Sequence, residues 1–231
     1  MGRLVLIGGG TYEEIDPIAA EIVRMTAKNK PNVLFIGTAL QDSTNPLTSC
    51  KKTFKRVAPG CIVKKLSLIR SSYTDDEIDS LIAEADIIFV GGGNTVYMLE
   101  EWKKRGLQEK LARVYREDTA VLAGISAGAV CWCSMAYTDS DSFLGLEEWH
   151  YRMMEPGINL LDIVLCPHYN VPGRESFDRE ILSTGKTGIA LEDDTALIDN
   201  QGEIGYIRCN ETAHVWRFMM RDGAYVKEQM I

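Results

Sequence analysis

The sequence predicts an α/β fold in which helices flank a mostly parallel sheet. Up to about residue 185, apolar runs of four to six residues alternate with longer stretches whose apolar residues recur at helical spacing. Parallel strands are buried on both faces and therefore read as continuous apolar runs, so this alternation favours a parallel sheet. After residue 185 short strands follow one another closely, which predicts an antiparallel extension on one edge of that sheet.

Individual elements follow from the same patterns. In chain order we expect strands at 3–7, 33–36, 62–66, 87–90 and 120–125, and helices at 13–28, 46–57, 96–104 and 107–117. Thr74 and Glu77 have the spacing of a capping box, which opens another helix ending near Ala85. A helix should also start at Ser126 and include Cys131 and Cys133.

The C-terminal part predicts strands rather than helices. They are expected at 188–191, 196–198, 203–207 and 215–219, with turns at 199–202 and 221–223. The sequence contains no internal repeat and no long linker, so residues 1–231 are expected to form a single domain.

Composition excludes several classes of function. The 231 residues include 25 Lys and Arg against 33 Asp and Glu, a formal charge of −8, which disfavours nucleic acids and anionic membranes as partners. The six cysteines form no CxxC pair and the three histidines form no cluster with them, so we expect no metal site. No apolar run has the length of a signal peptide or a membrane span, and we expect a cytoplasmic protein.

A G-x-S-x-G motif follows the apolar run at 120–125. In Gly124-Ile125-Ser126-Ala127-Gly128, the serine would sit on a tight strand-to-helix turn that projects its hydroxyl. The amide of Ala127, at a helix N-terminus, would point to where an oxyanion forms. The alternative is an ordinary turn in which Ser126 only caps the helix. The strand and helix around the motif favour the nucleophile.

A serine nucleophile needs a base, and the sequence offers His150, His168 and His214. His168 comes just after an apolar strand, and this places it at the carboxyl-end edge of a parallel sheet, the same edge as Ser126. We therefore favour His168 as the general base.

Several acids are candidates for the residue that orients the imidazole. Asp139 and Asp141 follow the Ser126 helix, whereas Glu192, Asp193 and Asp194 follow a later strand. Asp139 and Asp141 have the alternative role of turn residues. The sequence pattern alone does not choose among these acids.

The two glycine runs have different interpretations. The run at 91–93 follows a buried strand and could supply an oxyanion donor or a phosphate cradle, or form a plain turn. The run at 8–10 is similar to a nucleotide loop, but position 13 is Glu13, where a dinucleotide fingerprint requires glycine. We therefore expect no nucleotide cofactor. Asn94, Arg174 and Arg179 are candidate substrate-binding residues, with surface charge as the alternative for the two arginines.

Three blocks of sequence together resemble the family of peptidase E, the α-aspartyl dipeptidase, and cyanophycinase. They are Val90-Gly91-Gly92-Gly93-Asn94-Thr95, Gly124-Ile125-Ser126-Ala127-Gly128-Ala129 and Pro167-His168-Tyr169, in an order and spacing that fit most of residues 1–200. The resemblance implies a flavodoxin-like fold related to class I glutamine amidotransferases, with serine in place of the usual cysteine. It also implies Ser126 as nucleophile, His168 as base and the amides of Gly93 and Ala127 as oxyanion donors. The acid 15 residues after the serine is Asp141, with Asp139 and Glu192 as alternatives.

The function expected from these residues is serine-dependent hydrolysis of short peptides through an acyl-enzyme, without metal or cofactor. The resemblance implies dipeptides with an N-terminal Asp, although the loop at 170–176 is shorter than in peptidase E. The expected partner is a small peptide, and the chain is compatible with a homo-oligomer. Two alternatives are an esterase of the α/β-hydrolase type and a non-catalytic module that binds small ligands. The esterase is disfavoured because its histidine usually lies near the C-terminus.

Overall fold

A computed structural model describes residues 1–69, 72–144 and 150–231. Within these residues the central sheet has seven strands in the order β11-β10-β1-β5-β4-β2-β3. Its parallel part comprises β1 (Arg3–Ile7), β2 (Asn32–Ile36), β3 (Ile62–Leu66), β4 (Ile87–Val90) and β5 (Val121–Ile125). The antiparallel strands β10 (Thr195–Asn200) and β11 (Glu203–Arg208) extend the edge next to β1. The expected mixed α/β fold with a mostly parallel sheet is confirmed.

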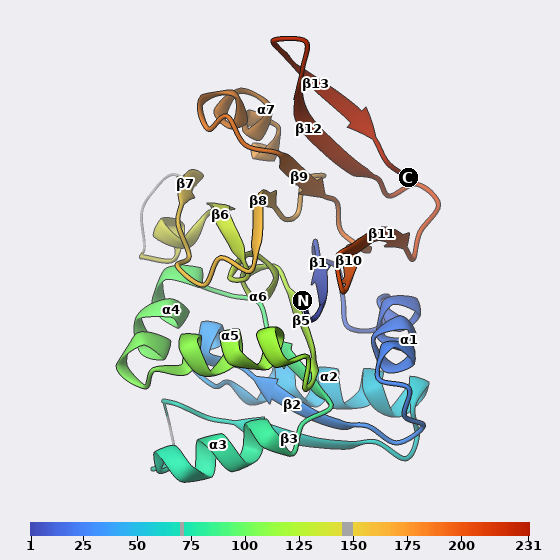
Figure 1. Ribbon diagram of the computed structural model, residues 1–231, viewed down its shortest axis with the longest axis vertical. Helices are drawn as coiled ribbons and strands as arrows, with labels where there is room; N and C mark the ends of the chain where they lie inside the picture. The colour runs from blue at the N-terminus through green and yellow to red at the C-terminus, as the bar shows by residue number, and fades with distance from the viewer. Residues whose placement is uncertain (70–71, 145–149) are drawn as a thin grey trace.

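Helices cover both faces of this sheet (Figure 1). On one face, Val5, Ile7 and Phe35 pack with residues of α1 (Asp16–Met25) and α2 (Thr44–Val57). On the other, Leu4, Leu6 and Leu34 pack with residues of α3 (Asp75–Ala83), α4 (Thr95–Lys104) and α5 (Leu107–Glu117). Side chains alternate between the faces of a strand, which is why neighbouring apolar residues of β1 belong to different core clusters. No helix among the described residues is both long enough and apolar enough to cross a lipid bilayer.

A second sheet of the described chain runs in the order β13-β12-β9-β8-β6-β7. Its strands are β6 (Cys133–Thr138), β7 (Arg152–Met154), β8 (Leu161–Cys166), β9 (Gly188–Leu191), β12 (Val215–Arg221) and β13 (Ala224–Gln229). β6, β8 and β9 pair in parallel. β7 is antiparallel to β6, β12 is antiparallel to β9, and β13 is antiparallel to β12. Short helical segments complete the chain: η1 (Thr38–Leu40), α6 (Ala127–Val130), η2 (Ser140–Leu144), η3 (Arg174–Ser176), α7 (Phe177–Glu180) and η4 (Ile181–Ser183).

Two details differ from the sequence-based expectations. The C-terminal strands do not all extend one sheet edge, because β10 and β11 join the first sheet while β9, β12 and β13 belong to the second. The Ser126 helix ends at Val130, so Cys133 begins strand β6 instead of lying in a helix. A buried helix and a buried strand are both apolar, and the short run from Ala127 to Ala136 does not distinguish them by periodicity.

Local sequence signals account for several boundaries. Thr74 and Glu77 form the capping box that was expected at the start of α3. Asp222 and Gly223 both have positive φ values, 52° and 83°, as a type I′ turn requires. This turn joins β12 to β13 in a hairpin that lies at the opposite end of the molecule from α3 (Figure 1).

Candidate active site

Ser126 lies between the end of β5 and the first residue of α6. Its backbone has φ 55° and ψ −116°, an arrangement that a non-glycine residue adopts only when its surroundings hold it there. The Ser126 N–H donates to the carbonyl of Ile7 at 3.0 Å, and its own carbonyl accepts the N–H of Ala129 at 2.8 Å. A Cβ atom at Gly124 would lie 2.0 Å from the carbonyl oxygen of Gly128, so the turn closes only with glycine at position 124. These contacts form the strand–elbow–helix geometry expected from the motif.

His168 is in the loop that follows β8. Its backbone φ is 53°, and its N–H donates to the carbonyl of Gly8 at 3.1 Å. The next residue, Tyr169, donates its N–H to the carbonyl of Leu191 at 3.0 Å. The histidine loop is therefore fastened to the chain that follows β1 and to the end of β9.

The imidazole of His168 is paired with the carboxylate of Asp193. The Nδ1 atom lies 2.7 Å from Oδ1 of Asp193, and the Asp193 N–H donates to the side-chain oxygen of Asn170 at 2.9 Å. The hydrogen bond from His168 holds the pKa of Asp193 below its usual range. A carboxylate accepts the proton of Nδ1, so in the neutral imidazole Nε2 carries the free lone pair.

Gly9 packs directly against this pair. A Cβ atom at position 9 would lie 2.2 Å from Nδ1 of His168 and 1.9 Å from Oδ1 of Asp193. The Gly9 carbonyl also accepts the N–H of Asp194 at 3.1 Å. The first glycine run thus makes room for the imidazole and the carboxylate.

Ser126 and His168 line the same cleft, which has a volume of about 340 Å³. The lining residues come from η1 and α2, from the loops that follow β6 and β8 of the second sheet, and from one edge of the first sheet: Gly10, Tyr12, Leu40, Pro46, Gly92, Gly93, Ile125, Ser126, Asp139 and His168. This edge holds the carboxyl ends of β1, β4 and β5, where ligands bind in open parallel sheets.

The two expected oxyanion donors are one residue that follows the serine and one that lines the same cleft. Gly93 lines the cleft, and Ala127 is the first residue of α6, where a helical N–H has no intrahelical acceptor. Within the described part of the chain, neither N–H has a hydrogen-bond acceptor. Both amides therefore stay candidates for binding a ligand oxygen.

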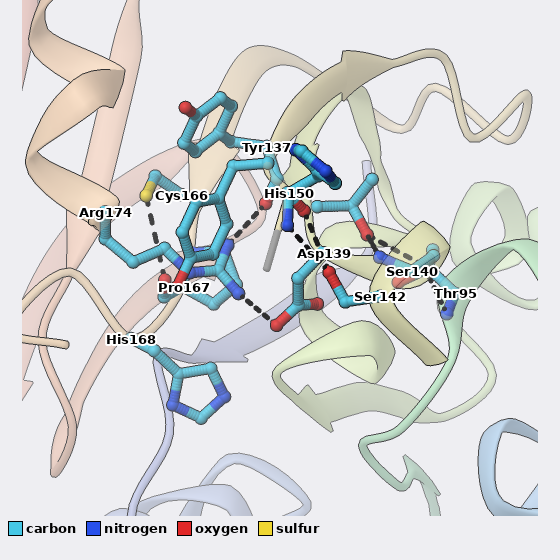
Figure 2. Close-up of polar contacts among 12 residues, drawn as sticks. Thr95, Tyr137, Asp139, Ser140, Ser142, His150, Cys166, Pro167, His168 and Arg174 are labelled. Carbon is cyan, nitrogen blue, oxygen red and sulfur yellow. Dashed lines mark hydrogen bonds and ion pairs between the residues drawn. The ribbon is translucent and has the colours of Figure 1, made fainter. Parts of the chain in front are cut away.

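The acids at 139, 141 and 192 form other contacts. Asp141 pairs with Arg152, and that hydrogen bond lowers its pKa. Glu192 accepts hydrogen bonds from the His214 N–H at 2.9 Å and from Trp216 Nε1 at 3.1 Å. Asp139 lines the cleft but is bonded to Arg174 at 2.9 Å (Figure 2). The carboxylate beside His168 is thus Asp193, whereas the resemblance implied Asp141.

The position of Asp193 beside His168 depends on the pairing of β8 with β9, which the sequence pattern did not predict. β8 and β9 are parallel neighbours, with Cys166 opposite Ala190, so the loops that carry His168 and Asp193 leave adjacent strands on the same side. The signal available in the sequence was an acid at the carboxyl end of a strand, and Asp193 shares that signal with Glu192 and Asp194.

The three candidate substrate-binding residues have other partners. Asn94 caps α4 by accepting the Tyr97 N–H at 3.0 Å and donates to the carbonyl of Ser140 at 3.1 Å. Arg179 is 81% exposed and pairs with Glu180. Arg174 is 2% exposed and donates to Asp139 and to the carbonyl of Tyr137. None of the three is among the described residues that line the cleft.

Comparisons with known sequences all match peptidases. The sequence profile of Peptidase family S51 matches residues 4–207. The uncharacterized peptidase YgaJ of Bacillus subtilis (strain 168) is 32% identical over 173 residues, 74% of this chain and 70% of the relative. The uncharacterized peptidase Lmo0363 of Listeria monocytogenes serovar 1/2a (strain ATCC BAA-679 / EGD-e) is 31% identical over 143 residues, 60% of this chain and 65% of the relative.

Two solved structures are similar in fold. One is a peptidase from an acI-B1 actinobacterium, with a TM-score of 0.72 and 21% identity, covering 100% of this chain and 94% of that one. The other is a putative peptidase E protein from Listeria monocytogenes EGD-e, with a TM-score of 0.66 and 22% identity, covering 90% of this chain and 98% of that one.

Proposed function

Since the chain belongs to peptidase family S51, a family of serine peptidases, we propose that it hydrolyses short peptides with a triad of Ser126, His168 and Asp193. The observation that carries this assignment is the 2.7 Å contact between His168 Nδ1 and Asp193 Oδ1, at a cleft that Ser126 also lines. The triad keeps the nucleophile and base expected from the sequence and replaces the expected acid Asp141 by Asp193.

The proposed reaction begins with attack of the Ser126 hydroxyl on the scissile carbonyl carbon, while Nε2 of His168 accepts the hydroxyl proton. Asp193 stabilises the imidazolium and keeps Nε2 directed to the cleft. The amides of Gly93 and Ala127 donate to the oxyanion, and one such donor typically lowers the barrier by about 3–4 kcal/mol. The imidazolium then protonates the leaving amine, and water hydrolyses the acyl-enzyme by the same steps.

The size of the cleft supports a short substrate. A volume of about 340 Å³ is at the lower end of the range for small-molecule sites, which suits a dipeptide better than an extended chain. We propose a small peptide as the partner of this site. Assembly into a homo-oligomer and a location in the cytoplasm stay predictions.

The test combines labelling with turnover. Purified protein would be treated with a fluorophosphonate and analysed by mass spectrometry, and a dipeptide panel would be assayed with wild type and Ser126→Ala. We expect an adduct on Ser126 and cleavage of at least one dipeptide, both lost in the variant. Absence of adduct and of turnover in wild type would favour a non-catalytic ligand-binding protein, and cleavage of esters but no peptides would favour an esterase.

A further inference from the structure

Arg174 is a sequence-predicted candidate for binding a substrate carboxylate, but its guanidinium is bonded inside the protein. One Nη atom donates to the carbonyl of Tyr137 at 2.9 Å and the other to Oδ2 of Asp139 at 2.9 Å. The guanidinium carbon also lies 4.5 Å from the centre of the Tyr151 ring. With 2% of its side chain exposed, Arg174 cannot reach a substrate carboxylate without breaking these contacts.

Asp139 is the charged end of this pair that faces the cleft. Its side chain is 21% exposed and lines the cleft together with Ser126 and His168. In Figure 2 the Asp139 carboxylate and the Arg174 guanidinium point toward one another and are joined by a dashed line. A substrate in the cleft would thus contact the Asp139 carboxylate, while the Arg174 guanidinium that pairs with it stays buried in the protein.

The segment that carries Asp139 is held rigidly by α4. The side-chain oxygen of Ser140 accepts the backbone N–H of Thr95 at 3.0 Å, and Asn94 donates to the Ser140 carbonyl at 3.1 Å. Two sets of contacts therefore fix Asp139: those of its C-terminal neighbour Ser140, and its own hydrogen bond from Arg174. A carboxylate fixed in this way loses little freedom when it accepts a further hydrogen bond.

A second carboxylate, that of Asp194, lies against Gly10, one of the residues that line the cleft. The pKa of Asp194 is raised by burial and by the negative charges of Glu14 and Asp193. No lysine or arginine lines the cleft within the residues that the structure describes. A carboxylate entering this site would lose its water next to Asp139, whereas an ammonium group would gain a charge-assisted hydrogen bond.

We propose that Asp139 determines specificity by binding an ammonium group on the residue that is transferred to Ser126, and that the site rejects an acidic side chain on that residue. This inference rests on the proposed serine-peptidase function. The ammonium is either the free N-terminus of the peptide or the end of a lysine side chain, and both offer the same donor chemistry. Specificity of this kind combines an attraction for one substrate with a repulsion of its competitor.

The experiment compares p-nitroanilides in matched pairs. Ala against N-acetyl-Ala tests the terminal ammonium, N-acetyl-Lys against N-acetyl-norleucine tests the side-chain ammonium, and Asn against Asp tests rejection of an acid. We expect the wild type to prefer Asn over Asp, and to prefer one of the two ammonium substrates over its partner, each by about tenfold or more in kcat/KM. In Asp139→Asn both preferences should fall below about threefold, mainly through KM.

Two further variants separate recognition from stability. Asp162→Asn removes one carboxylate from β8, where Asp162 is 75% exposed and paired with Lys186, and it should keep both preferences. The double variant Asp139→Asn with Arg174→Gln removes both charges of the buried pair, so it tests the same loss of preference if Asp139→Asn alone is unstable. Circular dichroism verifies the fold of each variant.

The outcomes separate this inference from the function on which it rests. If the fluorophosphonate labels Ser126 and the wild type cleaves peptides, but Asp is preferred over Asn or neither ammonium substrate is preferred, only the role of Asp139 is overturned. The same holds if the folded Asp139 variants keep the preferences. If the wild type shows neither labelling nor turnover, the proposed peptidase function fails and this inference fails with it.

Discussion

The serine side and the histidine side of the cleft are built in different ways. The elbow around Ser126 is made by consecutive residues, Gly124 to Gly128, whose close approach fixes the turn. The histidine side joins three loops that are distant in sequence, those of Gly9, His168 and Asp193. One side is thus encoded by a local motif, and the other by the pairing of strands.

This difference predicts how substitutions on each side of the cleft affect activity and fold. The Ser126 turn is held by its own strand and helix, with one hydrogen bond to Ile7 of β1. The orientation of His168 depends on the Asp193 carboxylate and on the absence of a side chain at Gly9. We therefore expect substitutions on the histidine side to reduce activity while leaving the serine elbow and the fold in place.

The largest effect is expected on the serine side. Ser126→Ala removes the attacking oxygen, and we expect kcat/KM for the best dipeptide to fall by about 10⁴-fold or more. The matched control is Ser80→Ala on the surface of α3, where the hydroxyl only donates to the carbonyl of Asp76. Activity of the Ser126 variant within about tenfold of wild type would place the nucleophile elsewhere.

The second effect tests the histidine side directly. Asp193→Asn replaces an acceptor by a group that can donate to Nδ1, so it favours the wrong tautomer of His168, and we expect kcat to fall by about 10²- to 10⁴-fold. Asp141→Asn disrupts only the pair with Arg152 and should change kcat by less than about tenfold. The reverse order of the two variants would restore Asp141 as the acid.

A smaller effect is expected at Gly9. Gly9→Ala places a methyl group where the imidazole and the Asp193 carboxylate lie, and we expect a displaced His168 and a loss of about 10²-fold in kcat. Gly205→Ala in β11 is the matched control, because a Cβ atom there has no neighbour within 4 Å. If the fluorophosphonate adduct forms at the wild-type rate in Gly9→Ala, the His168–Asp193 pair tolerates a methyl group at position 9 and this prediction is wrong.

The smallest effect concerns stability in acid. Asp193 has a lowered pKa in the folded protein, so its charge stabilises the fold above the unfolded value of about 3.9, and that contribution is lost as the pH falls through the folded pKa. With the side chain 30% exposed, we expect a contribution below about 1 kcal/mol. Urea titrations at pH 6 and pH 3 should show that Asp193→Asn loses less stability relative to wild type at pH 3 than at pH 6. An equal difference at both values would contradict this.

The contrast also explains how much the sequence could predict. The parallel strands and the Ser126 elbow follow from residues that are close in sequence, and the capping box of α3 and the hairpin turn at Asp222-Gly223 do so as well. His168 was expected at the same sheet edge as Ser126. It does line the same cleft, but it follows β8 of the second sheet, whereas Ser126 follows β5 of the first.

What the sequence did not predict requires long-range pairing. The preference for Asp193 rests on β9 lying beside β8, and the structure pairs Asp141 with Arg152 instead of with His168. The division of the C-terminal strands between two sheets has the same origin, since hairpin signals fix local turns and leave the choice of sheet to tertiary packing. Likewise, Arg174 was a candidate for substrate binding because its burial against Tyr151 and Asp139 cannot be deduced from composition.

The most direct test of the account is the proton on Nδ1 of His168. We would record proton NMR spectra of wild type, Asp193→Asn and Asp141→Asn in the low-field region, where a hydrogen bond from imidazole to carboxylate strongly deshields the proton. We expect a low-field resonance in wild type and in Asp141→Asn that disappears in Asp193→Asn and in His168→Gln. A resonance that survives in Asp193→Asn and disappears in Asp141→Asn would contradict this expectation.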